Sequence, residues 1–539
     1  MNQMKLKVIK TVFIFLFSIT GFSLFNEVKC QSNNPNWYIM NAPFKMEEVM
    51  IPEFQNKDFS IKDYGGINDG HTLNTDAFTK AITACAAAGG GRVIVPKGNW
   101  LTGPIELKSN VNLHLESGAI IQFTKDHTQY PMITASSKSN RIVTASPIYS
   151  YDLKNIAITG EGIIDGAGDS WRPVKKAKTT TSQWEDLVNS GGVVSADGSI
   201  WWPSVEAMKG EEYLKKLKKE NRKLTAEDYL PARDYLRPYM LYLINCKNIL
   251  IKNVTIRNSP KFVFYPNSCT GLTMNHVNIF NDWWAQNGDG IDISRCKNVL
   301  IYDCTVNARD DGICMKSSGG ENSTDGFNLE NIIIAQCIVY RAHGGFVIGS
   351  NTDGGMQNIF VDNCHFIGTN VGIRVKSNLG IGGNVKNIFV KNILMNDIRN
   401  EAILFDTHYK DAPAGSIRKN TINEESDKVP LFTDFYFDSI SCKGAKTAIS
   451  ITGLPQMPVT NIHFKNMNIT SDKGFIATDA SDIYLDNVKI IPEHGPVYRL
   501  YHVKNITINK GYFPLASAIF YKADSKTTGV NITETDLRK

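Results

Sequence analysis

Asp289, Asp310 and Asp311, in two short phrases, are the residues of this chain best suited to chemistry. The phrases are Asn287-Gly-Asp289-Gly-Ile-Asp292 and Arg309-Asp310-Asp311-Gly-Ile313. Either phrase alone is ordinary turn chemistry. Brought together, they would place three like charges in contact, which raises at least one pKa and serves no structural purpose. Such a cluster suits hydrolysis of a glycosidic bond, with one carboxyl protonated as the acid and others ionised to activate water.

Cationic and aromatic side chains follow this cluster along the chain. Arg374 and Lys376 lie two residues apart in an extended segment, so they share one face. A solvated face is one interpretation, but beside an acidic cluster the two cations would also form a carboxylate-binding site. His343 and Tyr409 are further candidates, although a lone histidine is more often structural than functional.

A short repeat, in which Asn precedes alternating apolar residues, indicates how these side chains are positioned. It occurs at Asn155, Asn248, Asn298, Asn331, Asn358, Asn387, Asn461 and Asn505. The spacings from Asn298 to Asn387 are 33, 27 and 29 residues. Short strands at such periods are typical of a solenoid or a propeller, and propeller blades need longer repeats. The sequence therefore predicts an all-β fold, a right-handed single-stranded parallel β-helix, with the Asn side chains stacked in a hydrogen-bonded ladder.

The same period explains the spacing of the acidic phrases. Asp289 precedes Asp310 by 21 residues, which is one short coil. Residues one coil apart stack at about 4.8 Å, the distance between neighbouring strands. We therefore expect Asp289 to lie beside the Asp310-Asp311 pair.

The cysteines obey the period too. Six of the ten cysteines fall at two repeated positions, Cys246, Cys269 and Cys296 at one and Cys304, Cys337 and Cys364 at the other. Stacked small apolar side chains inside a solenoid explain this pattern better than disulfides do.

The two ends of the chain have their own signals. Residues 1–30 resemble a signal peptide, because lysines precede an apolar run too short to span a membrane. Lys29 argues against a lipid anchor at Cys30. We expect an exported protein, periplasmic or extracellular, with no membrane span. Thr75 is expected to N-cap a helix that covers the first coil and ends at Gly89-Gly90-Gly91.

These signals divide the chain. We expect an N-terminal segment with its helical cap over residues 31–105 and a parallel β-helix over 106–510. A tryptophan-rich insert, residues 171–236, interrupts the β-helix, and a C-terminal cap follows over 511–539. The insert is expected to form a small helical excursion that shapes one wall of a cleft. The net charge of +5 is small for 539 residues, and nothing indicates nucleic-acid binding. We expect a monomer.

Taken together, these motifs resemble the polygalacturonases of glycoside hydrolase family 28, whose marks are Asn-Thr-Asp, Asp-Asp, Gly-His-Gly, Arg-Ile-Lys and a later tyrosine. This chain has Asn287-Gly-Asp289, Asp310-Asp311, Ala342-His-Gly344, Arg374-Val-Lys376 and Tyr409, in that order. The region from Asp63-Tyr-Gly to Leu101-Thr-Gly-Pro104 is also similar to the family's N-terminal part. Gly288, Ala342 and Val375 depart from the pattern without removing a reacting group.

The resemblance implies an inverting hydrolase of α-1,4-galacturonosyl bonds in pectin, an acidic polysaccharide, with no metal required. It implies that Asp310 is the general acid, that Asp289 and Asp311 activate water, and that His343 tunes the acid. Arg374, Lys376 and Tyr409 would bind a galacturonate carboxylate. We expect Arg295 to make an additional contact to a uronate of the substrate, and Trp284 or its neighbour Trp283 to stack on a sugar ring.

Several alternatives stay open at this point. The backbone could be rhamnogalacturonan, although Arg374 and Lys376 favour galacturonate. A Ca²⁺-dependent pectate-lyase-like enzyme or a non-catalytic polysaccharide-binding solenoid would keep the same fold. The insert and the loop Gly380-Ile-Gly-Gly383 resemble elements that block one end of the cleft in exo-acting relatives, so we expect release of monomer from chain ends.

Overall fold

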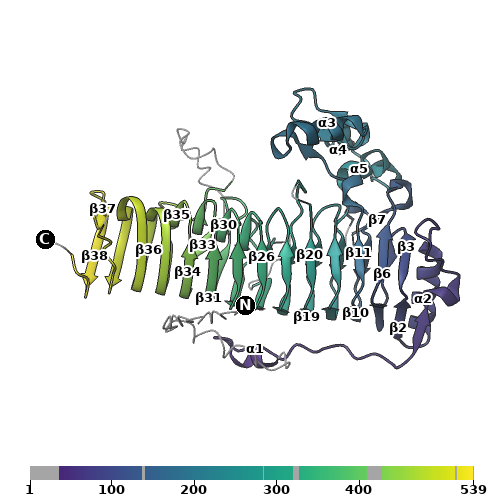
Figure 1. The fold of residues 1–539 in the computed structure, drawn as a ribbon, viewed down its shortest axis with the longest axis horizontal. Coiled ribbons are helices and arrows are strands. Elements are labelled where there is room, and N and C mark those ends of the chain that lie inside the picture. The colour runs from purple at the N-terminus through teal and green to yellow at the C-terminus, as the bar shows by residue number, and fades with distance from the viewer. Residues whose placement is uncertain are drawn as a thin grey trace, which may run out of the picture.

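The computed structural model describes residues 36–135, 140–282, 284–319, 327–409, 428–515, 517 and 519–537. These residues form a right-handed parallel β-helix, as predicted, in which one sheet of 33 strands winds along the length of the molecule (Figure 1). The predicted signal peptide, residues 1–30, lies outside the described residues. No described helix combines the length and the apolar character needed to cross a membrane.

Each middle coil contributes three strands, and each strand pairs in parallel with its equivalents in the neighbouring coils. We call the stack that carries the acidic motifs the site stack: β15 (Leu241–Ile244), β18 (Phe264–Asn267), β21 (Ile291–Ser294), β24 (Ile313–Lys316), β27 (Gly344–Ile348), β30 (Val371–Lys376), β32 (Glu401–Asp406) and β35 (Thr447–Thr452). The second stack contains β10 (Lys154–Gly160), β16 (Lys247–Lys252), β19 (Thr270–Asn275), β22 (Lys297–Tyr302), β25 (Leu329–Ala335), β28 (Met356–Asp362) and β31 (Asn384–Asn396). The third contains β11 (Ile163–Asp165), β17 (Thr255–Arg257), β20 (Asn278–Phe280), β23 (Thr305–Asn307), β26 (Ile338–Tyr340) and β29 (His365–Ile367).

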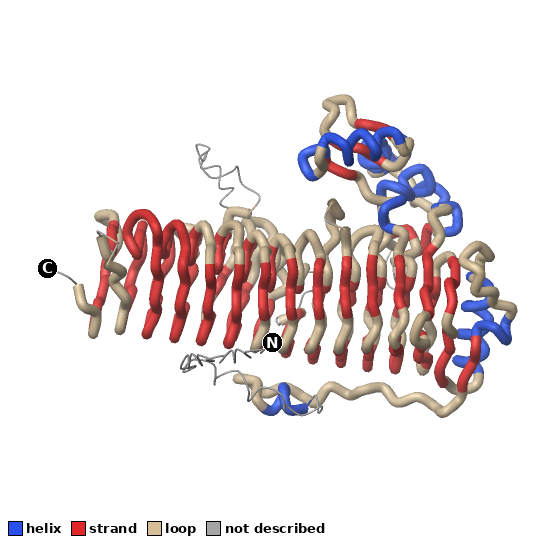
Figure 2. Tube along the Cα trace, viewed as in Figure 1, coloured by secondary structure: helices blue, strands red, loops and turns tan. Residues whose placement is uncertain are grey.

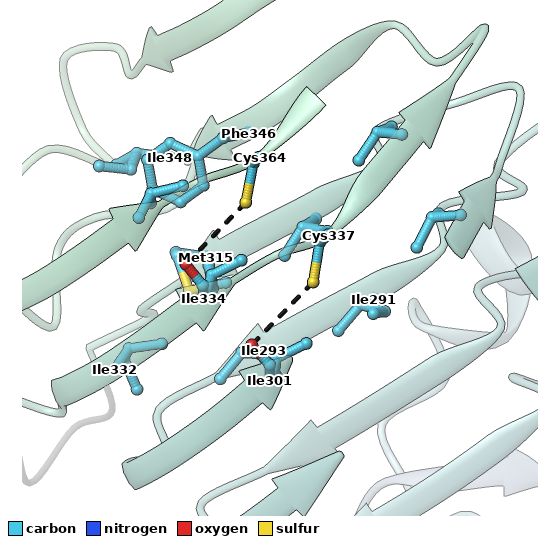
Figure 3. Close-up of a cluster of buried hydrophobic side chains, with 14 of the residues drawn as sticks. Ile291, Ile293, Ile301, Met315, Ile332, Ile334, Cys337, Phe346, Ile348 and Cys364 are labelled. Carbon is cyan, nitrogen blue, oxygen red and sulfur yellow. Dashed lines mark hydrogen bonds between the residues drawn. The ribbon is translucent and has the colours of Figure 1, made fainter. Parts of the chain in front are cut away.

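The inside of the coils is a continuous dry core. Equivalent side chains stack in register from coil to coil, for example Ile332 on Ile359 and Ile359 on Ile388, and all three are buried. Figure 3 shows isoleucines, methionine and phenylalanine from several coils meeting in this interior. Because burial of apolar surface stabilises by about 25 cal/mol per Å², a core that repeats along the axis supports each coil through its neighbours.

The predicted cysteine ladder is confirmed. All nine cysteines in the described part of the chain are buried and free of disulfides. In Figure 3, Cys337 and Cys364 point into the core from successive coils, each toward a backbone carbonyl oxygen 4.0 Å away. They act there as small apolar side chains.

The predicted asparagine ladder is confirmed as well. Asn331 Nδ2 donates to Asn298 Oδ1 at 3.0 Å, and Asn358 Nδ2 donates to Asn331 Oδ1 at 3.0 Å. Each has a positive φ, 60° at Asn331 and 57° at Asn358. Asparagine tolerates this left-handed conformation better than other side chains do, so it can turn the backbone and bond to the next coil at once.

The helix α2 (Thr75–Ala87) covers the open end of the first coils, as predicted (Figure 1). The predicted role of Thr75 as N-cap is wrong, because Thr75 is the first helical residue and Asn74 precedes the helix. The Asn74 amide instead bonds to backbone groups of Ile67, Thr72 and Leu101, and Thr75 Oγ1 accepts from the Gly103 N–H at 2.8 Å. Both side chains therefore fasten the helix to the adjoining strands.

Other early and late elements extend the solenoid. The first coils are built from β1 (Asp58–Ser60), β2 (Gly91–Val95), β3 (Gly98–Thr102), β4 (Ile105–Glu106), β5 (Val111–Leu115), β6 (Ala119–Phe123) and β9 (Ile148–Tyr151). The last coils contain β33 (Leu431–Phe432), β34 (Phe435–Lys443) and β36 (Val459–Asn509), on which β37 (Tyr521–Ala523) and β38 (Thr528–Thr533) pair in parallel. The short helix α1 (Asn36–Met40) packs Tyr38 against Leu300 and Ile333 on the outer face of the second stack.

The insert stands away from the coils. Between β11 and β15 the chain forms α3 (Thr181–Asn189), α4 (Val205–Leu217), α5 (Arg233–Leu236) and a small antiparallel sheet of β12 (Val174–Lys175), β14 (Ile200–Trp202) and β13 (Val193–Val194). Figure 2 shows these helices rising above the coils on the N-terminal half of the solenoid. A short hairpin, β7 (Met132–Thr134) and β8 (Ile142–Thr144), lies at its foot.

Candidate active site

The two acidic phrases lie side by side at the start of neighbouring strands in the site stack. Asp289 precedes β21 and Asp311 precedes β24, and the register pairs Ile291 with Ile313. Consequently Asp289 stands one coil from Asp311, and the Gly290 N–H donates to the Asp311 carbonyl oxygen at 2.9 Å. The expected juxtaposition of the aspartates is confirmed. Asp289 and Asp311 are buried, whereas Asp310 is partly exposed.

The two predicted cations, on β30, approach the same cluster. Lys376 Nζ lies 2.7 Å from Asp311 Oδ2, and Arg374 Nη1 lies 3.7 Å from Asp311 Oδ1. Burial disfavours the charge on Asp311, but Lys376 and the other nearby cations outweigh it and lower the pKa of this carboxyl. Asp311 is therefore an ionised group held in place by cations.

Asp310 has a different partner. His343 Nδ1 lies 3.0 Å from Asp310 Oδ1, and the Asn287 N–H donates to Asp310 Oδ2 at 3.2 Å. Burial raises the pKa of Asp310, but the His343 hydrogen bond and charge lower it further, to about 2. Asp310 is therefore held in its ionised form by its contact with His343.

Asp289 sits beside a buried carboxylate and a lysine, Asp292 and Lys316, that the sequence analysis did not count among the site residues. Lys316 Nζ lies 3.0 Å from Asp292 Oδ1 and 3.9 Å from Asp289 Oδ2. Burial, followed by the charges of Asp292 and Asp310, raises the pKa of Asp289 well above its usual range, and burial raises that of Asp292 to about 6. The alternation in Asp289-Gly-Ile-Asp292 and the position of Lys316 one coil later could have revealed both residues.

Tyr409 completes the cationic side of the cluster. Its ring centroid lies 4.8 Å from Lys376 Nζ and 5.3 Å from the Arg374 guanidinium carbon. An aromatic face beside two cations holds them in position and offers a polar edge to a ligand.

The remaining predicted contacts lie elsewhere. Arg295 follows β21, where its N–H donates to the Lys316 carbonyl oxygen at 3.0 Å. Trp284 borders a cavity against α3, together with Gln183 and Leu187, and Trp283 lies outside the described residues. Sugar contacts by Arg295 and Trp284 stay predictions.

The insert is tied directly to the acidic motif. Arg237 Nη2 donates to Asn287 Oδ1 at 2.9 Å, and Asn287 in turn contacts Asp310. Arg172, fully buried, donates through Nε to the Ser259 carbonyl oxygen at 2.6 Å. A Cβ added at Gly288 would lie 2.7 Å from Arg172 Nη1, so glycine here, in place of the family's threonine, fits the close approach of the insert.

Where the insert meets the site stack, a cavity of about 530 Å³ opens beside Asn287. Aromatic side chains from the site stack and cations from both parts line it: Tyr239, Tyr242, Phe262, Arg141, Arg237 and Lys261. Lys261 Nζ lies 4.9 Å from the Tyr239 ring centroid, and burial lowers the pKa of Lys261 to about 8. Aromatic faces with cations at the rim suit an acidic sugar.

One group of side chains in the site has the composition of a metal-binding cluster. Oxygen and nitrogen atoms of Asp310, Asp311 and His343 come within 4.8 Å of one another, close enough to share a metal ion. These ligand atoms already face protein partners, since His343 contacts Asp310 and Lys376 contacts Asp311. A divalent cation would have to displace Lys376, so the donor set does not fit a resident metal.

Comparison with known proteins agrees with this geometry. The exo-poly-alpha-D-galacturonosidase of Dickeya chrysanthemi is 28% identical over 474 residues, which cover 84% of this chain and 74% of that protein. A probable polygalacturonase of Vitis vinifera is 26% identical, over 76% of this chain and 74% of that protein. The crystal structure of a hyperthermoactive exopolygalacturonase from Thermotoga maritima is 26% identical with a TM-score of 0.64, covering 85% of this chain and 95% of that one. The family model for glycosyl hydrolases family 28 matches residues 175–489, more than half of the chain, and the chain therefore belongs to this family of glycoside hydrolases.

Proposed function

We propose that this protein is an exo-acting polygalacturonase, which hydrolyses α-1,4-galacturonosyl bonds at the ends of pectin chains with inversion. The observation that carries the proposal is the arrangement of charge. Three carboxyls are gathered on two neighbouring coils, Arg374 and Lys376 approach them on one side, and the cation-rimmed cavity lies on the other. A substrate with a carboxylate on each side of the scissile bond matches this pattern.

The proposed roles follow from the surroundings of each carboxyl. Asp310 is the most accessible of the three and hydrogen-bonds His343, so it is placed to protonate the leaving oxygen. Asp311 is ionised and fixed, and Asp289 has a raised pKa with Oδ1 free of hydrogen bonds among the described residues. A raised pKa makes Asp289 a stronger base for the attacking water once it has lost its proton, and the charge of Lys316 favours that ionised form.

The acid needs a proton that a carboxyl with a pKa of about 2 does not hold by itself at mildly acidic pH. His343 Nδ1 lies 3.0 Å from Asp310 Oδ1 and is placed to deliver a proton to this carboxyl. As negative charge develops on the leaving oxygen, Asp310 gives its proton to that oxygen, and a proton from His343 replaces it on the carboxylate.

Exo action rests on the insert. The insert and the site stack together line the cavity of about 530 Å³ beside Asn287, and we propose that the insert closes the cleft at this end. The chain end fits into this cavity, with its carboxylate facing Arg237 and Lys261 and its apolar face on Tyr239 and Phe262. A closed end of this size favours release of the terminal sugar as monomer.

Three rivals are weaker on specific grounds. A rhamnogalacturonan hydrolase would place neutral rhamnose on one side of the bond, where the cations face the site. A Ca²⁺-dependent lyase would need Asp311 free of Lys376. A binding-only solenoid would have no reason to keep Asp289 and Asp292 buried with raised pKa values.

We also propose that the protein is exported. This rests on the basic and apolar character of residues 1–30 and on the pectin substrate, a polymer outside the cell.

The test is incubation of the purified protein with polygalacturonate in EDTA, with reducing ends, ultraviolet absorbance and product size followed together. We expect reducing sugar without the ultraviolet absorbance of unsaturated uronates, and monomer as the first product. Absorbance that depends on Ca²⁺ would instead identify a lyase. Mixed oligomers and an early loss of viscosity would show endo action. The Asp310→Asn variant, folded but without turnover, is the control for the acid.

A further inference from the structure

His127 lies outside the acidic cluster, in the turn that follows β6, and contacts both ends of the insert. His127 Nε2 lies 3.1 Å from Ser170 Oγ, where the insert leaves the coils. His127 Nδ1 lies 3.0 Å from Asp234 Oδ1 in α5, where the insert returns. Trp171 packs on the imidazole face, with ring centroids 3.5 Å apart and planes 15° from parallel. One side chain of the first coils therefore joins the two stems of the insert, around Ser170 and around Asp234.

The hydrogen bonds around His127 account for two imidazole protons. Ser170 Oγ donates its single proton to the Ala167 carbonyl oxygen at 2.8 Å, so it accepts from His127 Nε2–H. Burial raises the pKa of Asp234, but the hydrogen bond and charge of His127 outweigh it and lower this pKa, so the ionised carboxylate accepts from Nδ1–H. The contacts therefore match an imidazolium, and the Trp171 ring face, which attracts a cation, matches it as well.

The charged groups around this imidazole come from three elements. α5 supplies Asp234 and Arg233, whose Nε lies 4.0 Å from Asp234 Oδ1. The turn after β6 supplies Lys125 and Asp126, and the start of the insert supplies Asp169. Lys125 pairs with Asp169, and Asp126 accepts hydrogen bonds within its own turn. Asp234 is therefore the carboxylate that balances the charge of the imidazolium.

The position of Asp234 connects this contact to the cavity beside Asn287. Arg237 directly follows α5, lines that cavity and donates to Asn287 Oδ1 at 2.9 Å. On another side of α5, Thr144 Oγ1 in β8 donates to the Arg233 carbonyl oxygen at 3.3 Å, and Thr144 lines the same cavity. A shift of α5 would therefore move one wall of the cavity.

We infer that His127 is a positioning residue: as an imidazolium it fastens both stems of the insert, keeps the cavity beside Asn287 formed, and so restricts hydrolysis to chain ends. The inference rests on the proposed exo action and adds its control by pH. A neutral imidazole has one N–H, so it can donate to Ser170 or to Asp234 but not to both. Histidine side chains in general change charge between about pH 5 and 8. Above this range the insert loses a fastening bond, and the cleft opens to internal bonds of the polymer.

The test uses His127→Ala and Asp234→Asn, which remove the two charges of the ion pair one at a time. The matched control is His494→Gln, which breaks an exposed histidine–aspartate contact of 2.6 Å, to Asp472, in the last coils. For each protein, the ratio of oligomer to monomer among the first products from polygalacturonate is measured at about pH 5 and about pH 8. A ratio of products is insensitive to the overall rate, which the acidic cluster also changes with pH.

We expect the wild type and the control to release chiefly monomer at about pH 5 and more oligomer at about pH 8. Both variants should release oligomer at either pH, with a ratio of oligomer to monomer at about pH 5 raised roughly 10-fold, the factor that loss of a charge-assisted hydrogen bond gives. A ratio that stays at the wild-type value in the variants, or that does not change with pH in the wild type, would overturn the inference.

A second measurement keeps the inference separate from the proposed function, which fails if the wild type does not hydrolyse galacturonan at all. Amide hydrogen exchange of residues 233–237 is compared between the proteins at about pH 5. We expect exchange roughly 10-fold faster in His127→Ala and Asp234→Asn than in the wild type and the control. Equal exchange rates in all four proteins would show that His127 does not fasten the insert.

Discussion

Replacing His343 with glutamine should move the alkaline limb of the pH profile to lower pH. In the wild type, His343 Nδ1 lies 3.0 Å from Asp310 Oδ1, and the pKa of Asp310 is about 2. In the proposed mechanism, His343 delivers the catalytic proton to Asp310. In His343→Gln the proton must reside on Asp310 alone.

The size of the effect follows from the hydrogen bond. A charge-assisted hydrogen bond contributes about 1.5–3 kcal/mol. Because the His343 side chain is 39% exposed, solvent screens it, and we take about 1.5 kcal/mol, or about one pKa unit. Loss of the imidazole therefore raises the pKa of Asp310 from about 2 to about 3. At pH 5 roughly 1% of Asp310 then carries a proton, so kcat/KM should fall roughly 100-fold and recover about tenfold per pH unit on acidification.

The assay measures kcat/KM on polygalacturonate between pH 3 and 7, because the pH dependence of kcat/KM reports the pKa values of the essential groups in the free protein. Thermal denaturation of both proteins over the same range checks that the fold is intact. A profile with the same shape and a lower plateau would refute the reasoning, because it would show that the proton does not come from the Asp310–His343 pair.

Three further outcomes test the site and the solenoid. Lys376→Met leaves buried Asp311 with the 3.7 Å contact to Arg374 as its one remaining ion pair among the described residues, so urea denaturation should show a free energy of unfolding lower by about 3 kcal/mol. Asp311→Asn/Lys376→Met removes both charges and should be less destabilised than the single variant. Asn331→Ala removes two ladder hydrogen bonds and places alanine at φ 60°, so the free energy of unfolding should fall by about 3 kcal/mol. Asn331→Gly removes the same bonds without the backbone strain and should lose about 1 kcal/mol less. Equal losses in the two variants would show that the strain is absent. Arg237→Gln breaks the 2.9 Å hydrogen bond to Asn287 and removes a cation from the cavity beside Asn287. The value of kcat/KM on polygalacturonate should therefore fall about 10- to 100-fold with an unchanged circular dichroism spectrum. A fall below twofold would exclude this cavity as the binding site of the chain end.

Much of this architecture could be predicted from the amino-acid sequence because a solenoid converts sequence period into spatial contact. Each coil touches only its neighbours, so the 21-residue separation of Asp289 and Asp310 was close enough to the observed step, 22 residues from Ile291 to Ile313, to predict their proximity; the register sets Asp289 opposite Asp311. The recurring Asn331 and Asn358 and the buried Cys337 and Cys364 followed from the same rule.

The sequence failed where contacts do not follow the period. Thr75 was expected to cap its helix, but its hydroxyl accepts a hydrogen bond from the N–H of Gly103, which directly follows β3. Trp284 faces α3, and only the folded insert determines that. The unequal pKa values of the carboxyls depend on burial and on which cation reaches which oxygen, and neither can be read from the spacing of Asp289 and Asp310.

The sequence by itself determined the repeating coil, its asparagine and cysteine ladders, and the gathering of Asp289, Asp310 and Asp311, but not the presence of Asp292 and Lys316 beside them. Tertiary structure alone decided how the insert docks, through Arg237 on Asn287 and Arg172 on Ser259, and so which end of the cleft is closed. It also decided that Lys316 and Lys261 reach buried positions near the carboxyls. The physical reason is that stacking is a nearest-neighbour interaction with a fixed step, whereas the position of an irregular segment depends on side-chain contacts between residues far apart in the chain.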